Sequence, residues 1–491
     1  MYIDVELALD TVLRELHRHI LPELKSRQGQ LSGQVVTMIL SFIATSDANA
    51  RSAESAAHTA DVLRLLKEGV QTLTAAGAST ASVDEVRGAL ASIESPGDSS
   101  RHLELPRLLE TTRDSMTPLA ASGSPVAHQW LARLIDAEIR RLKDSTSAQN
   151  LRFIGSHPNF EVNEQRVVTN ADFCAYLRRR FPAYPQIGGC AIQEVAGGFS
   201  KRTYLIDIDN APPELGRVVL RQDSPGGPTG TCVLDEIPIL VRVYEAGLSV
   251  PKLLWAEPDI SAFDVPFIVM ESMPGNCAIV EWQQRSKNGR TPIEELARQL
   301  ATLHTLPVDG LSDQERFSDS REYLRHYIEQ FETRWLRERI VCEPTLKLAF
   351  DWLKRNIPQK IERLSIVHGD ISERNILLQD GDITAILDWE LWHIGDPNEE
   401  IAYARPFIEQ VIPMEQFLAM YYAHGGPLYR PENARFWKPW YTVRTAAQIA
   451  SAMSTFVGGR NRTSKLCAAI LNYYEQMICE INSIMKDTWG P

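Results

Sequence analysis

The most informative segment of this sequence is Ile366-Val367-His368-Gly369-Asp370-Ile371-Ser372-Glu373-Arg374-Asn375-Ile376-Leu377-Leu378. An apolar strand leads into His-Gly-Asp, and Asn375 follows Asp370 by five positions. A second predicted strand, residues 383–387, then delivers Asp388. The pattern predicts two carboxylates and one amide at the ends of short buried strands. Carboxylate and amide oxygens are good ligands for hard cations such as Mg²⁺. A magnesium ion and a carboxylate base are the least that an enzyme needs to transfer a phosphoryl group to a hydroxyl.

Two further motifs follow in order, Ile386-Leu387-Asp388-Trp389-Glu390 and Gly395-Asp396-Pro397. With His-x-Asp-x4-Asn they have the spacing of a kinase catalytic loop and its metal-binding aspartate. Over about residues 185–425 the chain resembles the aminoglycoside-phosphotransferase family of small-molecule kinases. Within that family it resembles the branch that includes the domains fused to acyl-CoA dehydrogenases. In that family His-Gly-Asp replaces the His-Arg-Asp of protein kinases, and Asp-Trp-Glu replaces Asp-Phe-Gly. Single motifs mislead, but three in the correct context are specific.

The resemblance implies a role for each of these residues. Asp370 is expected to accept the proton of the acceptor hydroxyl or to orient that hydroxyl. Asn375 and Asp388 are expected to hold Mg²⁺. His368 is expected to pack the catalytic loop, because Asp370 already supplies the base. Asp396 is expected to brace the same loop by hydrogen bonding.

The predicted fold class is α+β, a bilobal protein-kinase-like fold preceded by an all-α domain. The predicted domains are a helical accessory domain (1–145), a linker and leading helix (146–184), a kinase-like N-lobe (185–273) and a helical C-lobe with the catalytic and acceptor sites (274–491). In the N-lobe, β-rich segments are separated by glycine and proline turns. In the C-lobe, Thr291-Pro292-Ile293-Glu294 has the form of a capping box that opens a helix.

Nucleotide-binding residues are expected in the N-lobe. Gly197, Gly198, Phe199 and Ser200 lie between two predicted strands, where glycines let main-chain N–H groups approach phosphates, although a plain hairpin turn would have the same pattern. Arg221 stands where the family usually has a Lys that holds phosphate. The domains fused to acyl-CoA dehydrogenases, which this segment resembles, also have Arg at this position. The guanidinium of Arg is bulkier than the ammonium group of Lys, but it stays charged and can bind phosphate through two N–H groups. Glu236 on the following helix is expected to pair with Arg221.

The segment Phe267-Ile268-Val269-Met270-Glu271-Ser272-Met273-Pro274-Gly275 is interpreted as the hinge between the lobes. A strand that stops at Pro-Gly suits a linker, although an edge strand ending in a turn gives the same pattern. Main-chain groups near Glu271, Ser272 and Met273 are expected to receive the adenine edge of ATP.

The acceptor end combines cationic and aromatic residues, with Arg405 and Arg444 as candidate anchors for an anionic substrate. A kinase that phosphorylates polycationic antibiotics needs an acidic acceptor pocket, so the cationic residues here favour a neutral or anionic acceptor. The aromatic residues Phe436, Trp437, Trp440 and Tyr441 are equally consistent with helical core.

The first residues add a second resemblance. Thr11-Val12-Leu13-Arg14-Glu15-Leu16 and Ile20-Leu21-Pro22-Glu23-Leu24 resemble a small helical protein that accompanies such kinases in bacterial levulinate catabolism, where a kinase phosphorylates 4-hydroxyacyl-CoA. The resemblance implies a fusion of that small protein with the kinase.

Composition narrows the classes of function. The chain has 491 residues and a formal net charge of −12, so general nucleic-acid binding is not expected. No apolar run is long enough to cross a bilayer, and no signal peptide is expected. Seven scattered cysteines without a Cys-x-x-Cys pair predict reduced thiols and a cytoplasmic location.

We therefore predict a kinase with ATP and Mg²⁺ as cofactors and a small-molecule alcohol as substrate, first a hydroxyacyl-CoA or other hydroxy-acid derivative. An antibiotic O-phosphotransferase, for aminoglycosides or macrolides, is the alternative acceptor class. A nucleotide-binding pseudokinase scaffold is the alternative of another class. A homodimer, and packing of the N-terminal helical domain on the kinase domain, are left open, as is the choice of ATP over GTP.

Overall fold

The computed structural model of the protein describes residues 48–77, 80–93, 105–144, 168–184, 186–195, 200–212, 215–224, 227, 229–277, 281–282, 284–287, 289–311, 316–340, 343–458, 460–461 and 464–489. The chain divides into two compact units. The helical unit comprises residues 1–162, 328–355 and 442–491, and the α+β unit comprises residues 163–327 and 356–441.

Neither unit is one continuous segment. Helices α11 (Ser320–Glu338) and α15 (Pro431–Val457) each begin in the α+β unit and end in the helical unit. The predicted C-lobe, residues 274–491, is therefore divided between the two units. Hydrophobic periodicity could not show this division, because it reports which residues of a helix are buried and not what covers them.

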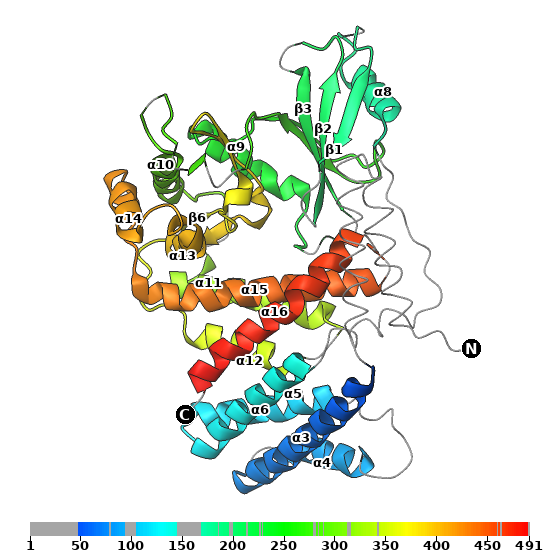
Figure 1. Ribbon diagram of the computed structural model, residues 1–491, viewed down its shortest axis with the longest axis vertical. Coiled ribbons are helices and arrows are strands. Elements are labelled where there is room, and N and C mark those ends of the chain that lie inside the picture. The colour runs from blue at the N-terminus through cyan, green and yellow to red at the C-terminus, as the bar shows by residue number, and fades with distance from the viewer. Residues whose placement is uncertain are drawn as a thin grey trace, which may run out of the picture. The chain divides into compact units, whose positions relative to one another are not determined.

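A five-stranded antiparallel sheet forms the first part of the α+β unit, in the order β1-β2-β3-β5-β4. Its elements are α8 (Asn170–Arg180), β1 (Cys190–Glu194), β2 (Lys201–Ile208), β3 (Arg217–Asp223), η5 (Val233–Glu236), α9 (Ile237–Glu245), β4 (Leu253–Glu257) and β5 (Phe267–Glu271). Helix α8 packs against β1 (Figure 1). Alternate residues of a strand face opposite sides, so Val218 and Leu220 of β3 enter the core together with Phe173 and Leu177 of α8.

Helices and two two-stranded sheets, β6-β9 and β7-β8, form the second part of this unit. They are α10 (Pro292–Thr305), β6 (Ser365–Val367), η8 (Glu373–Asn375), β7 (Ile376–Gln379), β8 (Asp382–Ile386), η9 (Trp389–Leu391), β9 (His393–Gly395), α13 (Pro397–Ile408) and α14 (Met414–Ala423). The predicted capping box is present at α10, because Thr291 Oγ1 accepts from the Glu294 N–H and the Glu294 carboxylate accepts from the Thr291 N–H. The predicted α+β class, with a sheet lobe before a helical lobe, is confirmed.

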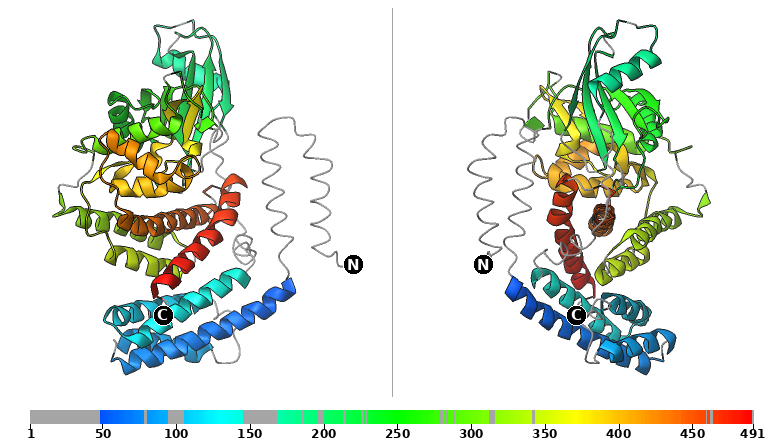
Figure 2. Two further views of the ribbon diagram at one scale, coloured as in Figure 1. Left: turned by 60° about the vertical axis from the view of Figure 1, so that its left-hand side comes forward. Right: turned by 90° about the vertical axis from the view of Figure 1, so that its right-hand side faces the viewer.

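The helical unit contains α3 (Ala48–Ala75), α4 (Thr80–Ile93), α5 (Leu105–Ala121), α6 (Pro125–Asp144), α12 (Pro344–Arg355) and α16 (Ser464–Trp489). Helices α3 to α6 lie side by side, and α6 also packs on α16 (Figure 2). The indole of Trp130 is fully buried and donates to the Leu65 carbonyl at 2.7 Å. The segments that carry the levulinate resemblance, residues 11–24, lie outside the described residues.

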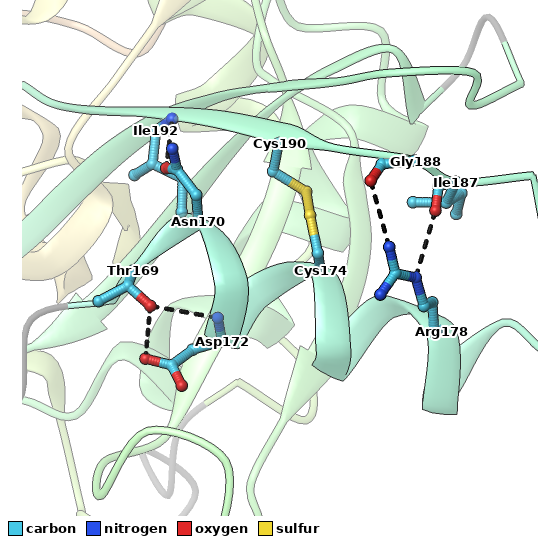
Figure 3. Close-up of a disulfide and its surroundings, with 9 residues drawn as sticks. All are labelled: Thr169, Asn170, Asp172, Cys174, Arg178, Ile187, Gly188, Cys190 and Ile192. Atoms are coloured by element: carbon cyan, nitrogen blue, oxygen red, sulfur yellow. Dashed lines mark hydrogen bonds between the residues drawn. A yellow bond between two sulfur atoms is a disulfide. The ribbon is translucent and has the colours of Figure 1, made fainter.

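The expectation that the cysteines are all reduced thiols is wrong for one pair. Cys174 of α8 and Cys190 of β1 form a disulfide (Figure 3). The residues are 16 positions apart in sequence, and the packing of α8 on the edge of the sheet brings them together. Arg178 supports the same junction by donating to the carbonyls of Ile187 and Gly188. A cysteine count could not reveal the pair, because pairing depends on distance in the fold.

None of the helices in the described part of the chain has a stretch long and apolar enough to cross a membrane.

Candidate active site

The catalytic-loop motif follows β6 directly. Gly369 has φ of +83°, a left-handed conformation that glycine adopts without strain, and the chain turns there to present Asp370. The side chain of Asn375 reaches back to this residue: its Nδ2 donates to Asp370 Oδ2 at 2.8 Å and to the Asp370 carbonyl at 2.9 Å. The predicted base and the first predicted metal ligand are therefore in direct contact.

The β7–β8 hairpin brings the second predicted metal ligand to the same place. Ile376 pairs with Ile386, and the Leu387 N–H donates to the Asn375 carbonyl at 2.7 Å. Asn375 immediately precedes this hairpin and Asp388 follows its last residue by two positions, so both lie near its open end. Asp388 has φ of +67°, an unusual conformation for a residue with a Cβ, and such conformations gather at functional sites.

Arg221 connects this site to the sheet. It lies on the face of β3 opposite the core, and its guanidinium donates to Asp388 Oδ1 at 2.9 Å and to Glu236 Oε1 at 3.1 Å. Burial opposes its charge, but the carboxylates of Glu236 and Asp388 outweigh that effect and raise the pKa of Arg221. The predicted pairing of Glu236 with Arg221 is thus present in the structure, with Glu236 only 2% exposed.

Sequence reasoning missed two participants next to this ion pair. Lys201 of β2 is buried; its Nζ lies 3.0 Å from Asp223 Oδ1 and 3.9 Å from Glu390 Oε2. Glu390 also accepts a hydrogen bond from Ser200 Oγ. Burial, and then repulsion from Asp388, raise the pKa of Glu390 to about 8. The sequence did contain one signal. Lys201 begins one predicted strand and Asp223 ends the next, so an antiparallel hairpin places the cation opposite the carboxylate.

His368 has no exposed surface and occupies the back of the loop. Its Nε2 faces the Leu387 carbonyl at 2.9 Å and its Nδ1 accepts from the Asp370 N–H at 3.2 Å, so the neutral tautomer with a proton on Nε2 satisfies both. Its ring meets the indole of Trp389 edge to face at 4.6 Å. This geometry agrees with a packing role, which stays a prediction.

The expectation that Asp396 braces the catalytic loop does not agree with its contacts. Asp396 caps α13 by accepting from the Asn398 N–H at 3.0 Å, and it also accepts from the side chains of Asn433 and Trp437. Glu400 contacts the loop instead, accepting from the N–H of His368 at 2.5 Å and of Gly369 at 3.4 Å. Burial raises the pKa of Glu400 to about 7. A motif aspartate and a helix residue four positions later could not be told apart from spacing alone.

The predicted hinge lies between two hydrogen-bonded segments. The Glu271 N–H donates to the Lys252 carbonyl, and pairing resumes where Asn276 and Leu378 form a bridge. Ser272 and Met273 lie between these points. Gly275 has φ of +110°, and a Cβ there would lie 2.6 Å from the Leu378 carbonyl oxygen, so only glycine fits. Of the predicted phosphate loop, Gly197, Gly198 and Phe199 lie outside the described residues, and Ser200 is its described end.

The two predicted substrate anchors lie in different units of the chain. Arg405 lies on the surface of α13 and forms an ion pair with Glu409 at 2.9 Å. Arg444 is 2% exposed and belongs to the helical unit. Phe436, Trp437 and Trp440 are buried, which agrees with the alternative that these aromatics are core. The indole of Trp440 donates to Glu399 Oε1 at 2.9 Å. The sequence shows that these residues are aromatic, but it does not show whether they line an acceptor pocket or fill the core between helices.

The donor set can be tested against magnesium. Within the described residues no group of three His, Cys, Asp or Glu side chains is arranged to hold a metal ion. Asn375 uses its amide nitrogen on Asp370, which leaves its amide oxygen available to a metal ion. Asp388 follows Leu387, whose N–H donates to the Asn375 carbonyl, and its side chain is 26% exposed. One amide and one carboxylate fit Mg²⁺, which keeps several waters and takes further oxygens from phosphates.

A family model described as "Phosphotransferase enzyme family" matches residues 191–437, about half of the chain. The chain belongs to this family. The matched range contains β2 to β5, the catalytic loop, the β7–β8 hairpin and α13. The predicted family and the predicted phosphotransferase class of enzyme are confirmed.

Relatives of this phosphotransferase chain include acyl-CoA dehydrogenase family members. Member 11 of Gallus gallus is 25% identical over 259 residues, which are 50% of this chain and 32% of the relative. Member 10 of Mus musculus is 25% identical over 217 residues, 42% of this chain and 19% of the relative. The chain thus spans about a third or less of the length of these relatives.

Solved structures with a similar fold include a macrolide 2′-phosphotransferase type I and a Plasmodium vivax ethanolamine kinase. The first has a TM-score of 0.42 and 18% identity, covering 62% of this chain and 97% of its own. The second has a TM-score of 0.44 and 14% identity, covering 61% and 83%.

Proposed function

We propose that this protein is an ATP-dependent kinase that transfers the γ-phosphate to a hydroxyl group of a small molecule. The observation that carries the proposal is a chain of contacts: Asp370 with the side chain of Asn375, the main chain of Asn375 with that of Leu387, and Asp388 with the guanidinium of Arg221. Phosphoryl transfer needs positioning and charge neutralisation more than covalent chemistry, and this set offers both.

Each residue has a chemical task in this proposal. Asp370 orients the acceptor hydroxyl and receives its proton. Asn375 and Asp388 hold Mg²⁺, which when bound neutralises charge on the transferring phosphate. Arg221 holds the phosphates near Asp388, with Ser200 at the end of the glycine loop. Ser272 and Met273 receive the adenine edge through their main chain.

The charge balance around Arg221 supports a bound cation. Two cationic side chains, Arg221 and Lys201, face four carboxylates, which are those of Asp223, Glu236, Asp388 and Glu390. A buried excess of carboxylate is unfavourable unless a cation compensates it. The raised pKa of Glu390 keeps its carboxyl protonated at neutral pH and removes part of this excess, and a Mg²⁺ ion held by Asn375 and Asp388 would compensate charge that remains.

For the acceptor we propose a hydroxyacyl-CoA or a related hydroxy-acid derivative. The support is the similarity to proteins named as acyl-CoA dehydrogenase family members, within half of the chain. The substrate anchors Arg405 and Arg444 give this proposal no support, since one is paired at the surface and the other is buried in the helical unit.

A competition assay tests the proposal. Purified protein is given MgATP with a 4-hydroxyacyl-CoA, kanamycin and erythromycin together, and phosphorylated products are identified by mass spectrometry. Phosphorylation of the hydroxyacyl-CoA is expected, and its loss in Asp370→Ala. Turnover of the antibiotics alone would reject the acceptor class. Nucleotide binding with no phosphorylated alcohol would instead favour the pseudokinase scaffold.

A further inference from the structure

A tyrosine outside all the sequence motifs contacts the predicted base. The hydroxyl of Tyr403, on α13, donates to Asp370 Oδ1 at 2.5 Å. The other carboxylate oxygen, Oδ2, accepts from Asn375 Nδ2 at 2.8 Å. Both oxygens of Asp370 are therefore held, one from the hairpin side and one from α13. Because two bonds on different oxygens fix rotation about the side-chain torsions, the carboxylate plane is fixed in one orientation.

Helix α13 holds the catalytic loop at two successive points. Glu400 and Tyr403 are three residues apart, so they lie on one face of the helix. Glu400 accepts from the main-chain N–H groups of His368 and Gly369, and Tyr403 reaches the side chain of the next residue, Asp370. One helix face thus fixes both the main chain of the loop and the side chain that it presents.

The phenol is suited to be a permanent donor. Burial, and then the charge of Asp370, raise the pKa of Tyr403, so its hydroxyl keeps its proton across the usual range of pH. The ring lies 4.5 Å from the ring of Tyr441 of α15, within the same unit, which restricts its motion. A carboxylate oxygen has two lone pairs, so Oδ1 can accept from Tyr403 and still receive a second hydroxyl.

We propose that Tyr403 is a positioning residue that holds the Asp370 carboxylate in the orientation that receives the acceptor hydroxyl. The inference rests on the proposed function. It assigns to α13 a part in catalysis that the three motifs do not contain.

The first test compares Tyr403→Phe with Tyr421→Phe. Tyr421 is a matched control, since its buried hydroxyl lies 2.7 Å from His304 Nδ1 and takes no part in the proposed site. Phe keeps the ring contact with Tyr441 and removes the hydroxyl, which bonds to Asp370 and also interacts with the Tyr441 hydroxyl. With MgATP and a 4-hydroxyacyl-CoA, Tyr403→Phe is expected to lower kcat about 10- to 100-fold, the scale of a small misplacement of reacting groups. KM for ATP is expected to stay within about twofold, since the altered contact is absent from the nucleotide site.

A double-mutant cycle separates positioning from other roles. In the Asp370→Ala background, Tyr403→Phe is expected to cause no further loss of the residual rate, because nothing remains to be positioned. Equal fractional losses in both backgrounds would mean that Tyr403 acts without Asp370 and would overturn the inference. So would an unchanged kcat in Tyr403→Phe, or an equal loss in Tyr421→Phe. A wild-type protein that phosphorylates no alcohol would reject the proposed function first, whereas normal wild-type turnover with an inert Tyr403→Phe would reject only this inference.

Discussion

The two halves of the proposed site are built on different physical principles. The catalytic loop is held by hydrogen bonds: His368 is tied to Leu387, the loop main chain to Glu400, and Asp370 to Asn375 and Tyr403. The sheet side is held by charge, with Arg221 between Glu236 and Asp388. Hydrogen bonds fix direction over a short range, whereas buried charges act over a longer range and respond to any added ion. We therefore expect the loop to determine the rate of transfer and the sheet side to determine nucleotide and metal binding.

The largest expected effect comes from the loop. Asp370→Ala should lower kcat about 10²- to 10⁴-fold, the usual contribution of a positioned proton acceptor. MgATP affinity, measured by calorimetry, should stay near that of the wild type. A large loss of nucleotide affinity in this variant would contradict the division of tasks between loop and sheet.

The next effect is on the sheet side. Arg221→Met leaves Glu236 buried without its cation, and removing one partner of a buried pair costs about 3–5 kcal/mol. Chemical denaturation should show this loss together with weaker MgATP binding. Arg221→Lys should recover part of both. The control is Arg202→Met, whose partner Glu194 lies on the neighbouring strand and is 34% exposed, so at most about 1 kcal/mol is expected.

A third prediction concerns pH. Burial raises the pKa of Glu400 from its ordinary value of 4.5 to about 7. Between these values the unfolded chain loses this proton and the folded chain keeps it, so the contribution to stability is present at low pH and is lost as pH rises toward 7. A shift of this size corresponds to about 3 kcal/mol.

Denaturation of wild type and Glu400→Gln across pH 4.5–7.5 measures this contribution. Glutamine cannot ionise and retains an oxygen for the His368 N–H, so the difference in unfolding free energy should move in favour of the variant as pH rises. A pH-independent difference would show that Glu400 titrates alike in the folded and unfolded chains.

The smallest expected effect is that of Ser200→Ala. Ser200 Oγ donates to Glu390 at the described end of the glycine loop. Losing one hydrogen bond costs about 0.5–1.5 kcal/mol, and the pKa of Glu390, raised to about 8, means that its carboxyl is mostly neutral at pH 7. KM for ATP should rise less than tenfold while kcat stays near the wild-type value. A fall in kcat comparable with that of Tyr403→Phe would instead couple this contact to the transfer step.

Residue types at fixed spacing were sufficient to predict part of the site. Asp370, Asn375 and Asp388 could be found because strand, loop and hairpin are local structures, and their connection leaves little freedom in where the ligands meet. Arg221 and Glu236 could be paired for a similar reason, since only 15 residues separate them. Glu400 and Tyr403 were missed because a helix pattern shows which residues share a face and not which loop that face meets.

The sequence by itself determined the α+β class, the order of the motifs and the acidic and amide groups of the proposed site, because these depend on local periodicity and short-range spacing. Only the tertiary structure decided that Cys174 meets Cys190, that Glu400 rather than Asp396 holds the loop, that Lys201 joins the charge cluster, and that Arg405 and Arg444 belong to different units. These contacts join residues whose separation in space is fixed by packing between elements, and the free energy of that packing is shared among many side chains that no motif records.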